Sequence, residues 1–166
     1  MRVIIFTQNE PFYLAENLDY FFKSLSRDIN IVGVCLTSAS PYGKKETFRK
    51  KILKILKVFG FKFFIYYSIK YLLKFFNKNK DVKYVLRKHK IKIINLKSSV
   101  NHDESIKQLS LYQPDLIVSI LGNEIFKKEI ISLPKKGIIN LHSSLLPKYR
   151  GLMPSFWVLK NNEKFT

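Results

Sequence analysis

Asn140 and His142 are the residues of this chain whose types and spacing are best suited to chemistry. They end a short apolar run and precede a loop that closes at Gly151. Side chains two residues apart on a strand point to the same face of a sheet. An amide can donate a hydrogen bond to a developing oxyanion, and an imidazole can move a proton near neutral pH. The pair therefore predicts a reactive site at the carboxyl edge of a sheet, where open α/β folds bind their ligands.

The segment from Asn140 to Gly151 reads Asn-Leu-His-Ser-Ser-Leu-Leu-Pro-Lys-Tyr-Arg-Gly. It resembles the signature of the folate-dependent formyltransferases, which include methionyl-tRNA formyltransferase, glycinamide ribonucleotide formyltransferase and the sugar N-formyltransferases. The resemblance implies a Rossmann-like domain, 10-formyltetrahydrofolate as the formyl donor and a primary amine as the acceptor. It assigns catalysis to Asn140 and His142. The family's third catalytic residue, an aspartate, would lie beyond Thr166, so we expect an N-terminal part with weak or no turnover by itself.

The rest of the motif is expected to shape the loop and to contact the substrate. The residues assigned to these roles are Ser144, Leu146, Pro147, Tyr149, Arg150 and Gly151. Ser144 is expected to bond the loop backbone. Arg150 is expected either to contact an anionic group of the acceptor or to cap the loop, and Gly151 to supply a backbone angle barred to other residues.

By the same resemblance, folate lies against the strand and loop that precede the motif strand. That region comprises Ile120, Leu121, Gly122 and Asn123. Gly122 is expected to let the backbone approach a flat pterin ring, or simply to end the strand. No cysteines and histidines have the spacing of a metal site, so no metal is predicted, and the single cysteine, Cys35, is expected to be a buried core thiol.

Alternating strands and helices are expected to position these residues. Short apolar runs rich in β-branched residues predict strands over residues 3–7, 29–36, 92–96, 116–121 and 138–141. Helices are expected over about 11–26, 81–89, 103–112 and 124–132, with Pro11 in the first turn of the first helix. The alternation predicts an α/β fold with a Rossmann-like, mostly parallel sheet and flanking helices. Residues 1–166 are interpreted as one catalytic domain, incomplete at its C-terminus.

Positive charge is concentrated in the middle of the chain. The formal net charge is +18, and residues 44–97 hold 18 Lys and Arg against two acids, which gives +16 of the total. Residues 44–90 are therefore interpreted as a basic helical insert within the domain. Lysines interrupt its apolar residues too often for a span of about 20 apolar residues. Residues 50–78 instead predict two amphipathic helices with a hinge at Gly60.

Several interpretations of this insert remain open. Its aromatic faces could pack on the domain's own core, or it could lie in the interface of an anionic membrane, which suits lysine and aromatic side chains. It could also contact a partner subunit or nucleic acid, although no nucleic-acid-binding motif is present. A solvated basic helix face is the simplest explanation of the charge alone.

The resemblance thus predicts formyl transfer to a primary amine. The expected acceptor is an amino sugar, either free or linked to a nucleotide, that is used to make surface polysaccharide. Methionyl-tRNA formyltransferase is the alternative, disfavoured because residues 7–11 read Thr-Gln-Asn-Glu-Pro where the transfer-RNA enzymes carry a Gly-Thr-Pro turn. A non-enzymatic alternative also remains open. The chain would then be an inactive truncated remnant, or a basic module that binds a membrane or a partner. The start of the chain reads as a strand and not as a signal peptide, so a cytoplasmic location is expected, with peripheral membrane contact through residues 50–78. A homodimer of the full-length protein remains open.

Overall fold

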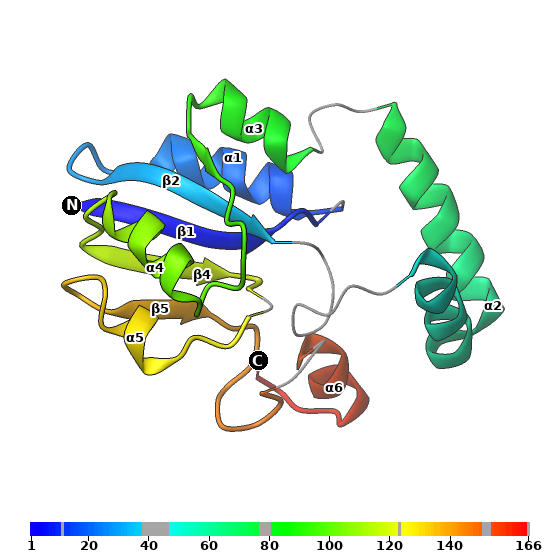
Figure 1. Ribbon diagram of the computed structural model, residues 1–166. Helices are drawn as coiled ribbons and strands as arrows, with labels where there is room; N and C mark the ends of the chain where they lie inside the picture. The colour runs from blue at the N-terminus through cyan, green and yellow to red at the C-terminus, as the bar shows by residue number, and fades with distance from the viewer. Residues whose placement is uncertain (11, 38–46, 77–80, 123, 151–153, 166) are drawn as a thin grey trace.

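The computed structural model describes residues 1–10, 12–37, 47–76, 81–122, 124–150 and 154–165. Five parallel strands form one sheet in the order β3-β2-β1-β4-β5 (Figure 1). Their bounds are Arg2–Gln8 for β1, Asn30–Thr37 for β2, Ile93–Ile94 for β3, Leu116–Ile120 for β4 and Ile138–Leu141 for β5. The predicted α/β, Rossmann-like fold is confirmed.

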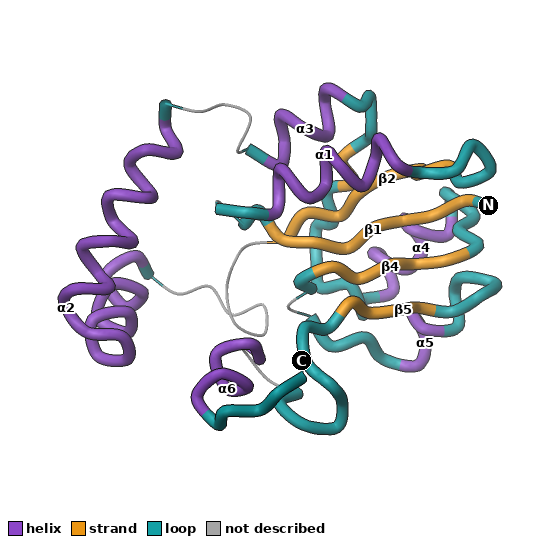
Figure 2. The backbone as a smooth tube through the Cα atoms, turned by 180° about the vertical axis from the view of Figure 1, so that it is seen from behind, coloured by secondary structure: helices purple, strands orange, loops and turns teal. Residues whose placement is uncertain are grey.

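Helices cover both faces of the sheet. Figures 1 and 2, which view it from opposite sides, show α4 and α5 on one face and α1 and α3 on the other. The bounds are Leu14–Ser24 for α1, Phe48–Phe75 for α2, Val82–Lys88 for α3, Asp103–Ser110 for α4, Lys128–Ile131 for α5 and Pro154–Lys160 for α6. The order of strands and helices agrees with the prediction, although β3 and α5 are shorter than expected.

The central strand β1 is buried on both faces, as an apolar run in a parallel sheet requires. Val3 and Ile5 pack with α1 and α3, whereas Ile4 and Phe6 pack with α4 and α5. Cys35 on β2 belongs to the second cluster and is 1% exposed, which confirms the predicted core thiol. Burial raises the pKa of this thiol to about 12, and the nearby Glu124 carboxylate adds to the effect.

α1 begins at Leu14, later than the start near Pro11 that the sequence predicted. The carboxylate of Glu10 accepts backbone N–H bonds from Phe12 at 2.8 Å, Tyr13 at 2.8 Å and Leu14 at 3.0 Å. These are N–H groups at a helix start, which have no partner within the helix. The chain therefore turns around Glu10 before the helix begins. Pro11 lies outside the described residues.

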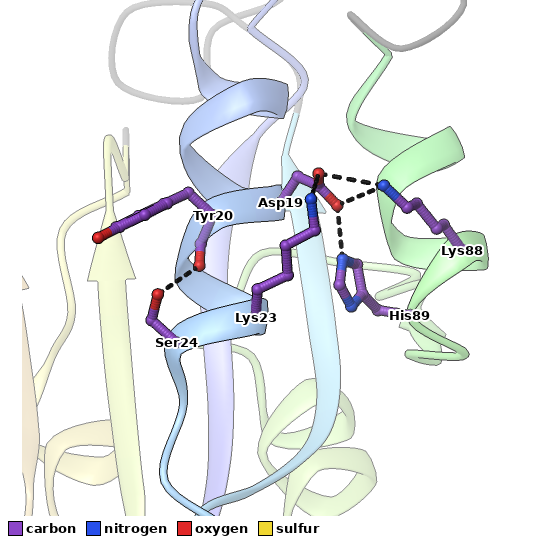
Figure 3. Close-up of polar contacts among 6 residues, drawn as sticks. All are labelled: Asp19, Tyr20, Lys23, Ser24, Lys88 and His89. Carbon is purple, nitrogen blue, oxygen red and sulfur yellow. Dashed lines mark hydrogen bonds and ion pairs between the residues drawn. The ribbon is translucent and has the colours of Figure 1, made fainter.

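An acidic side chain on α1 holds α3 in place (Figure 3). Asp19 accepts a hydrogen bond from Nε2 of His89 at 2.7 Å, and Nζ of Lys88 lies 3.0 Å from the same carboxylate. Lys23, one turn along α1, approaches it at 2.7 Å. Bonds from Lys23, His89 and Lys88 hold the pKa of Asp19 far below its usual range.

The segment interpreted as a basic insert contains two different parts. α3 belongs to the core, because Val82, Val85 and Leu86 are buried against the sheet. α2 instead stands beyond the carboxyl ends of β1 and β2, on the same side as α6 (Figures 1 and 2). Within α2, Gly60 has φ 80° and ψ 174°, so the helix breaks there. The predicted break between two helical halves at Gly60 is confirmed.

Candidate active site

The predicted catalytic strand β5 lies beside β4 at the edge of the sheet. Its register pairs Asn140 with Ser119 and Leu141 with Ile120. Because parallel strands end at the same edge, the motif that follows β5 lies next to the segment that follows β4. Asn140 is exposed at this edge, whereas Ser119 is buried. The two segments that the sequence assigned to catalysis and to folate are therefore neighbours.

His142 is the first residue after β5, and its ring is held by a buried neighbour. The hydroxyl of Ser144 lies 3.0 Å from Nδ1 of His142. The same hydroxyl lies 3.2 Å from the carbonyl oxygen of Lys148 and 3.4 Å from that of Tyr149. Ser144 thus bonds the loop backbone, as the sequence predicted, and also orients His142, which the sequence did not predict.

The two carbonyl oxygens beside Ser144 favour one tautomer of the neutral imidazole of His142. A carbonyl oxygen only accepts, so a hydrogen bond to either loop carbonyl uses the single hydroxyl proton of Ser144. The hydroxyl oxygen then accepts a hydrogen bond from Nδ1–H of His142. Nε2 of His142 is left without a proton in this tautomer, and its lone pair can take a proton from a substrate.

The loop after His142 is braced by its own backbone. The N–H of Lys148 donates to the carbonyl of Leu145 at 3.1 Å, and Nε of Arg150 donates to the carbonyl of Pro147 at 3.1 Å. Arg150 therefore caps the loop, one of its two expected roles, while its side chain remains exposed. Gly151 was expected to supply an unusual backbone angle, but it lies outside the described residues.

Residues after α6 return to this loop and hold it from outside. Glu163 accepts hydrogen bonds from Nζ of Lys148 at 2.9 Å and from the hydroxyl of Tyr149 at 2.8 Å, and Asn161 donates to that same hydroxyl at 2.8 Å. The bonds from Lys148 and then Tyr149 lower the pKa of Glu163. Sequence reasoning missed Glu163 and Asn161, because only the path of the chain around α6 brings them back to the motif.

Apolar side chains flank the polar pair. Leu121 after β4 and Leu145 and Leu146 in the motif loop are 45 to 62% exposed. Gly122 has a structural reason to be glycine, since a Cβ there would lie 2.2 Å from the hydroxyl oxygen of Ser119. Asn123, assigned with Ile120, Leu121 and Gly122 to folate, lies outside the described residues.

The sequence model of the formyl transferase family, described as "Formyl transferase", matches residues 1–166. The chain belongs to the formyl transferase family. The family's formyl donor is 10-formyltetrahydrofolate. This sheet edge suits an acyl donor that carries a flat ring. It presents an exposed amide, a half-buried imidazole whose ring is held by Ser144, and exposed leucines.

Curated members of the family are similar to part of the chain. Methionyl-tRNA formyltransferase of Clostridium tetani is 42% identical over 85 residues, which cover 51% of this chain and 27% of that protein. The bifunctional polymyxin resistance protein ArnA of Wigglesworthia glossinidia brevipalpis is 47% identical over 79 residues, which cover 48% of this chain and 12% of that protein. The chain thus matches about a quarter or less of each relative's length.

Solved structures share the fold over nearly the whole chain. Phosphoribosylglycinamide formyltransferase from Anaplasma phagocytophilum matches with a TM-score of 0.58 and 18% identity, over 97% of this chain and 58% of its own. The corresponding enzyme from Bacillus halodurans has a TM-score of 0.57 and 17% identity, over 98% of this chain and 66% of its own. At this identity the likeness establishes the fold of the family and not the acceptor.

Proposed function

We propose that this chain carries the formyl-transfer site of an enzyme that moves a formyl group from 10-formyltetrahydrofolate to a primary amine. The observation that carries the proposal is the hydrogen bond between Ser144 and Nδ1 of His142, two residues after the exposed Asn140. It leaves Nε2 of His142 as a proton acceptor beside an oxyanion donor. Acyl transfer to an amine needs both functions.

The roles of the residues follow from the bonds that change. When bound, 10-formyltetrahydrofolate supplies the formyl carbon, and its nitrogen leaves with the electron pair of the broken carbon–nitrogen bond. Nε2 of His142 takes the proton of the attacking amine, whose nitrogen forms the new bond to carbon. The side-chain amide of Asn140 donates to the formyl oxygen as negative charge develops there. The proton held by His142 is then available to the leaving nitrogen.

The proposed contacts of the folate are Ile120, Leu121, Gly122 and Asn123. Leu121 follows β4 and Leu146 lies in the loop after the neighbouring β5, and both side chains are exposed. A flat ring between them would lie within reach of the backbone at Gly122. Leu146 and Pro147 complete the apolar part of the site in this proposal.

The proposed acceptor is an amino sugar, in its nucleotide-linked form. Arg150 is exposed on the motif loop, and its guanidinium suits a phosphate of such a substrate. The helix start after β1, a common anion site, is filled by the chain's own Glu10 carboxylate. Methionyl-tRNA is the second candidate, favoured by the similarity to methionyl-tRNA formyltransferase. A cytoplasmic location, peripheral to the inner face of the membrane through α2, belongs to the same proposal.

Release of tetrahydrofolate from 10-formyltetrahydrofolate would test the proposal, with amino-sugar nucleotides and methionyl-tRNA as alternative acceptors. Because the chain by itself is expected to turn over only weakly, we expect slow acceptor-dependent release with an amino-sugar nucleotide, and a further fall of about 100-fold or more in kcat for Asn140→Ala and for His142→Ala. Binding of the folate, measured by calorimetry, should change little in both variants. Asn95→Ala and His102→Ala change the same residue types at exposed positions elsewhere and serve as controls. Wild-type turnover in both site variants, or no binding of the folate, would contradict the proposal.

A further inference from the structure

The second half of α2 packs on the domain with only one of its sides. Tyr67 lies 4.4 Å from Phe12, measured between ring centroids, and Phe63 stacks on Tyr67 at 5.3 Å. Nζ of Lys70 lies 4.1 Å from the ring centroid of Tyr13, whose hydroxyl it also contacts. These contacts fix which side of the helix faces the domain and leave the other side outward.

The outward side of this half is apolar. Its side chains recur at intervals of four, four, three and four residues, which places them in one stripe along a helix. They are Phe61, Ile65, Ile69 and Leu72 of α2 and Phe76, which directly follows the helix, and they are 43 to 88% exposed. A stripe of exposed large apolar side chains marks a surface that binds a protein or a membrane. We refer to these five residues as the apolar stripe.

The first half of α2, before the break at Gly60, is basic. Lys50, Leu53 and Lys57 are exposed at spacings of three and four, and Arg49 is also exposed, while Lys62 is exposed just after the break. The sequence of α2 contains no acidic residue over its whole length. Among the described residues, no helix is long and apolar enough to cross a membrane.

We propose that α2 is a docking surface for an anionic lipid bilayer. The apolar stripe enters the region between headgroups and acyl chains, and Lys50, Lys57 and Lys62 bind anionic headgroups. A helix with apolar and aromatic side chains and with lysines that reach the headgroups lies in the plane of a bilayer. The break at Gly60 lets the two halves lie at different angles, so that both can meet a flat surface.

Two features favour lipid over nucleic acid or an acidic protein. Aliphatic side chains such as Ile65, Ile69 and Leu72 offer neither base stacking nor hydrogen bonds, which single-stranded nucleic acids need. A surface for a specific protein partner usually carries charges of both signs. The lysines of α2 have no acidic residue among them and flank the apolar stripe. A bilayer with anionic headgroups meets both halves at once.

Docking through α2 would also orient the candidate active site. Phe59, just before the break, meets Phe156 of α6 edge-on at 6.0 Å. α6 follows the motif loop, and α2 and α6 lie on the same side of the sheet, beyond its carboxyl ends (Figure 1). The membrane would therefore lie on the side of the molecule that holds Asn140 and His142.

Sedimentation with vesicles tests this directly and needs no turnover, so its result is independent of the proposed formyl transfer. We expect the chain to bind vesicles that contain phosphatidylglycerol and to bind pure phosphatidylcholine vesicles at least about tenfold more weakly. The triple variant Ile65→Ser, Ile69→Ser, Leu72→Ser should bind anionic vesicles at least about tenfold more weakly. The triple variant Lys50→Gln, Lys57→Gln, Lys62→Gln should bind anionic vesicles more weakly than the wild type. The binding that remains should depend much less on salt concentration.

Matched variants change the same chemistry elsewhere on the surface. Tyr20→Ser, Leu111→Ser and Ile125→Ser remove exposed apolar side chains, and Lys107→Gln, Lys128→Gln and Lys136→Gln remove exposed charge. Both control triples should bind vesicles as the wild type does, with circular dichroism to show that each variant is folded. Absence of binding to anionic vesicles would overturn the proposal. The proposal would also be overturned if the control variants lost as much vesicle binding as the α2 variants, or if the chain bound RNA but not vesicles.

Discussion

The hydroxyl oxygen of Ser144 lies 3.0 Å from Nδ1 of His142, two residues away, while the same hydroxyl reaches the carbonyls of Lys148 and Tyr149. Ser144 therefore holds the ring of His142, and its contacts with the loop carbonyls favour the Nδ1–H tautomer of the neutral imidazole. Its own burial protects this arrangement from water.

Replacing Ser144 with alanine should release the imidazole of His142. We expect nitrogen chemical shifts of His142 to show the Nδ1–H tautomer in the wild type and a mixture in Ser144→Ala. Formyl transfer should fall by about 10- to 100-fold in kcat, less than the full contribution of a general base. Ser132→Ala removes a serine that bonds only a helix carbonyl and should change neither measurement. An unchanged tautomer in Ser144→Ala would refute the assigned role.

Gly122 and Ser119 are predicted to be coupled. A methyl group at residue 122 would lie 2.2 Å from the hydroxyl oxygen of Ser119, but 3.5 Å from its Cβ, which is an ordinary contact. Gly122→Ala should therefore destabilise the protein by about 1–3 kcal/mol, as overpacking does. Adding Ser119→Ala should recover at least about 1 kcal/mol of that loss. Chemical denaturation of the four proteins measures the coupling, and additive effects would show that the contact is not the cause.

Glu10 is predicted to stabilise the start of α1. Its carboxylate accepts three backbone N–H bonds, so Glu10→Ala leaves those groups without a partner in the protein. The expected loss is about 1 kcal/mol, typical of a helix cap. The thermal midpoint should fall by about 2–4 °C, as expected for a chain of this size. Glu16→Ala, at an exposed position of the same helix, is the control and should change the midpoint less.

Asp19 is predicted to make stability depend on acid pH. Because Lys23, His89 and Lys88 hold its pKa below the ordinary 3.8, the folded protein keeps the charged form more readily than the unfolded chain. Its contribution is present above pH 3.8 and is lost as the pH falls further. The thermal midpoint of Asp19→Asn should therefore lie below that of the wild type at pH 6, and the difference should shrink below pH 3.8. Glu16→Gln is the control, and a difference that does not depend on pH would contradict the linkage.

Local patterns in the sequence were enough for the fold and for the place of the motif within it. Runs of β-branched residues alternating with amphipathic segments specify a parallel sheet, because a strand between two helical layers must be apolar on both sides. β5 has the predicted bounds, Ile138–Leu141. The motif after it identified the family and placed Asn140 and His142 at the edge of the sheet.

Contacts between distant residues were decided by the tertiary structure. The return of Glu163 to Lys148 and Tyr149, and the approach of His89 to Asp19, depend on the path of the chain, which residue spacing does not encode. The orientation of α2 is a further case. The second half of α2 carries apolar side chains on both sides, so periodicity alone defines no inner face there. The contact of Tyr67 with Phe12 shows which side meets the domain.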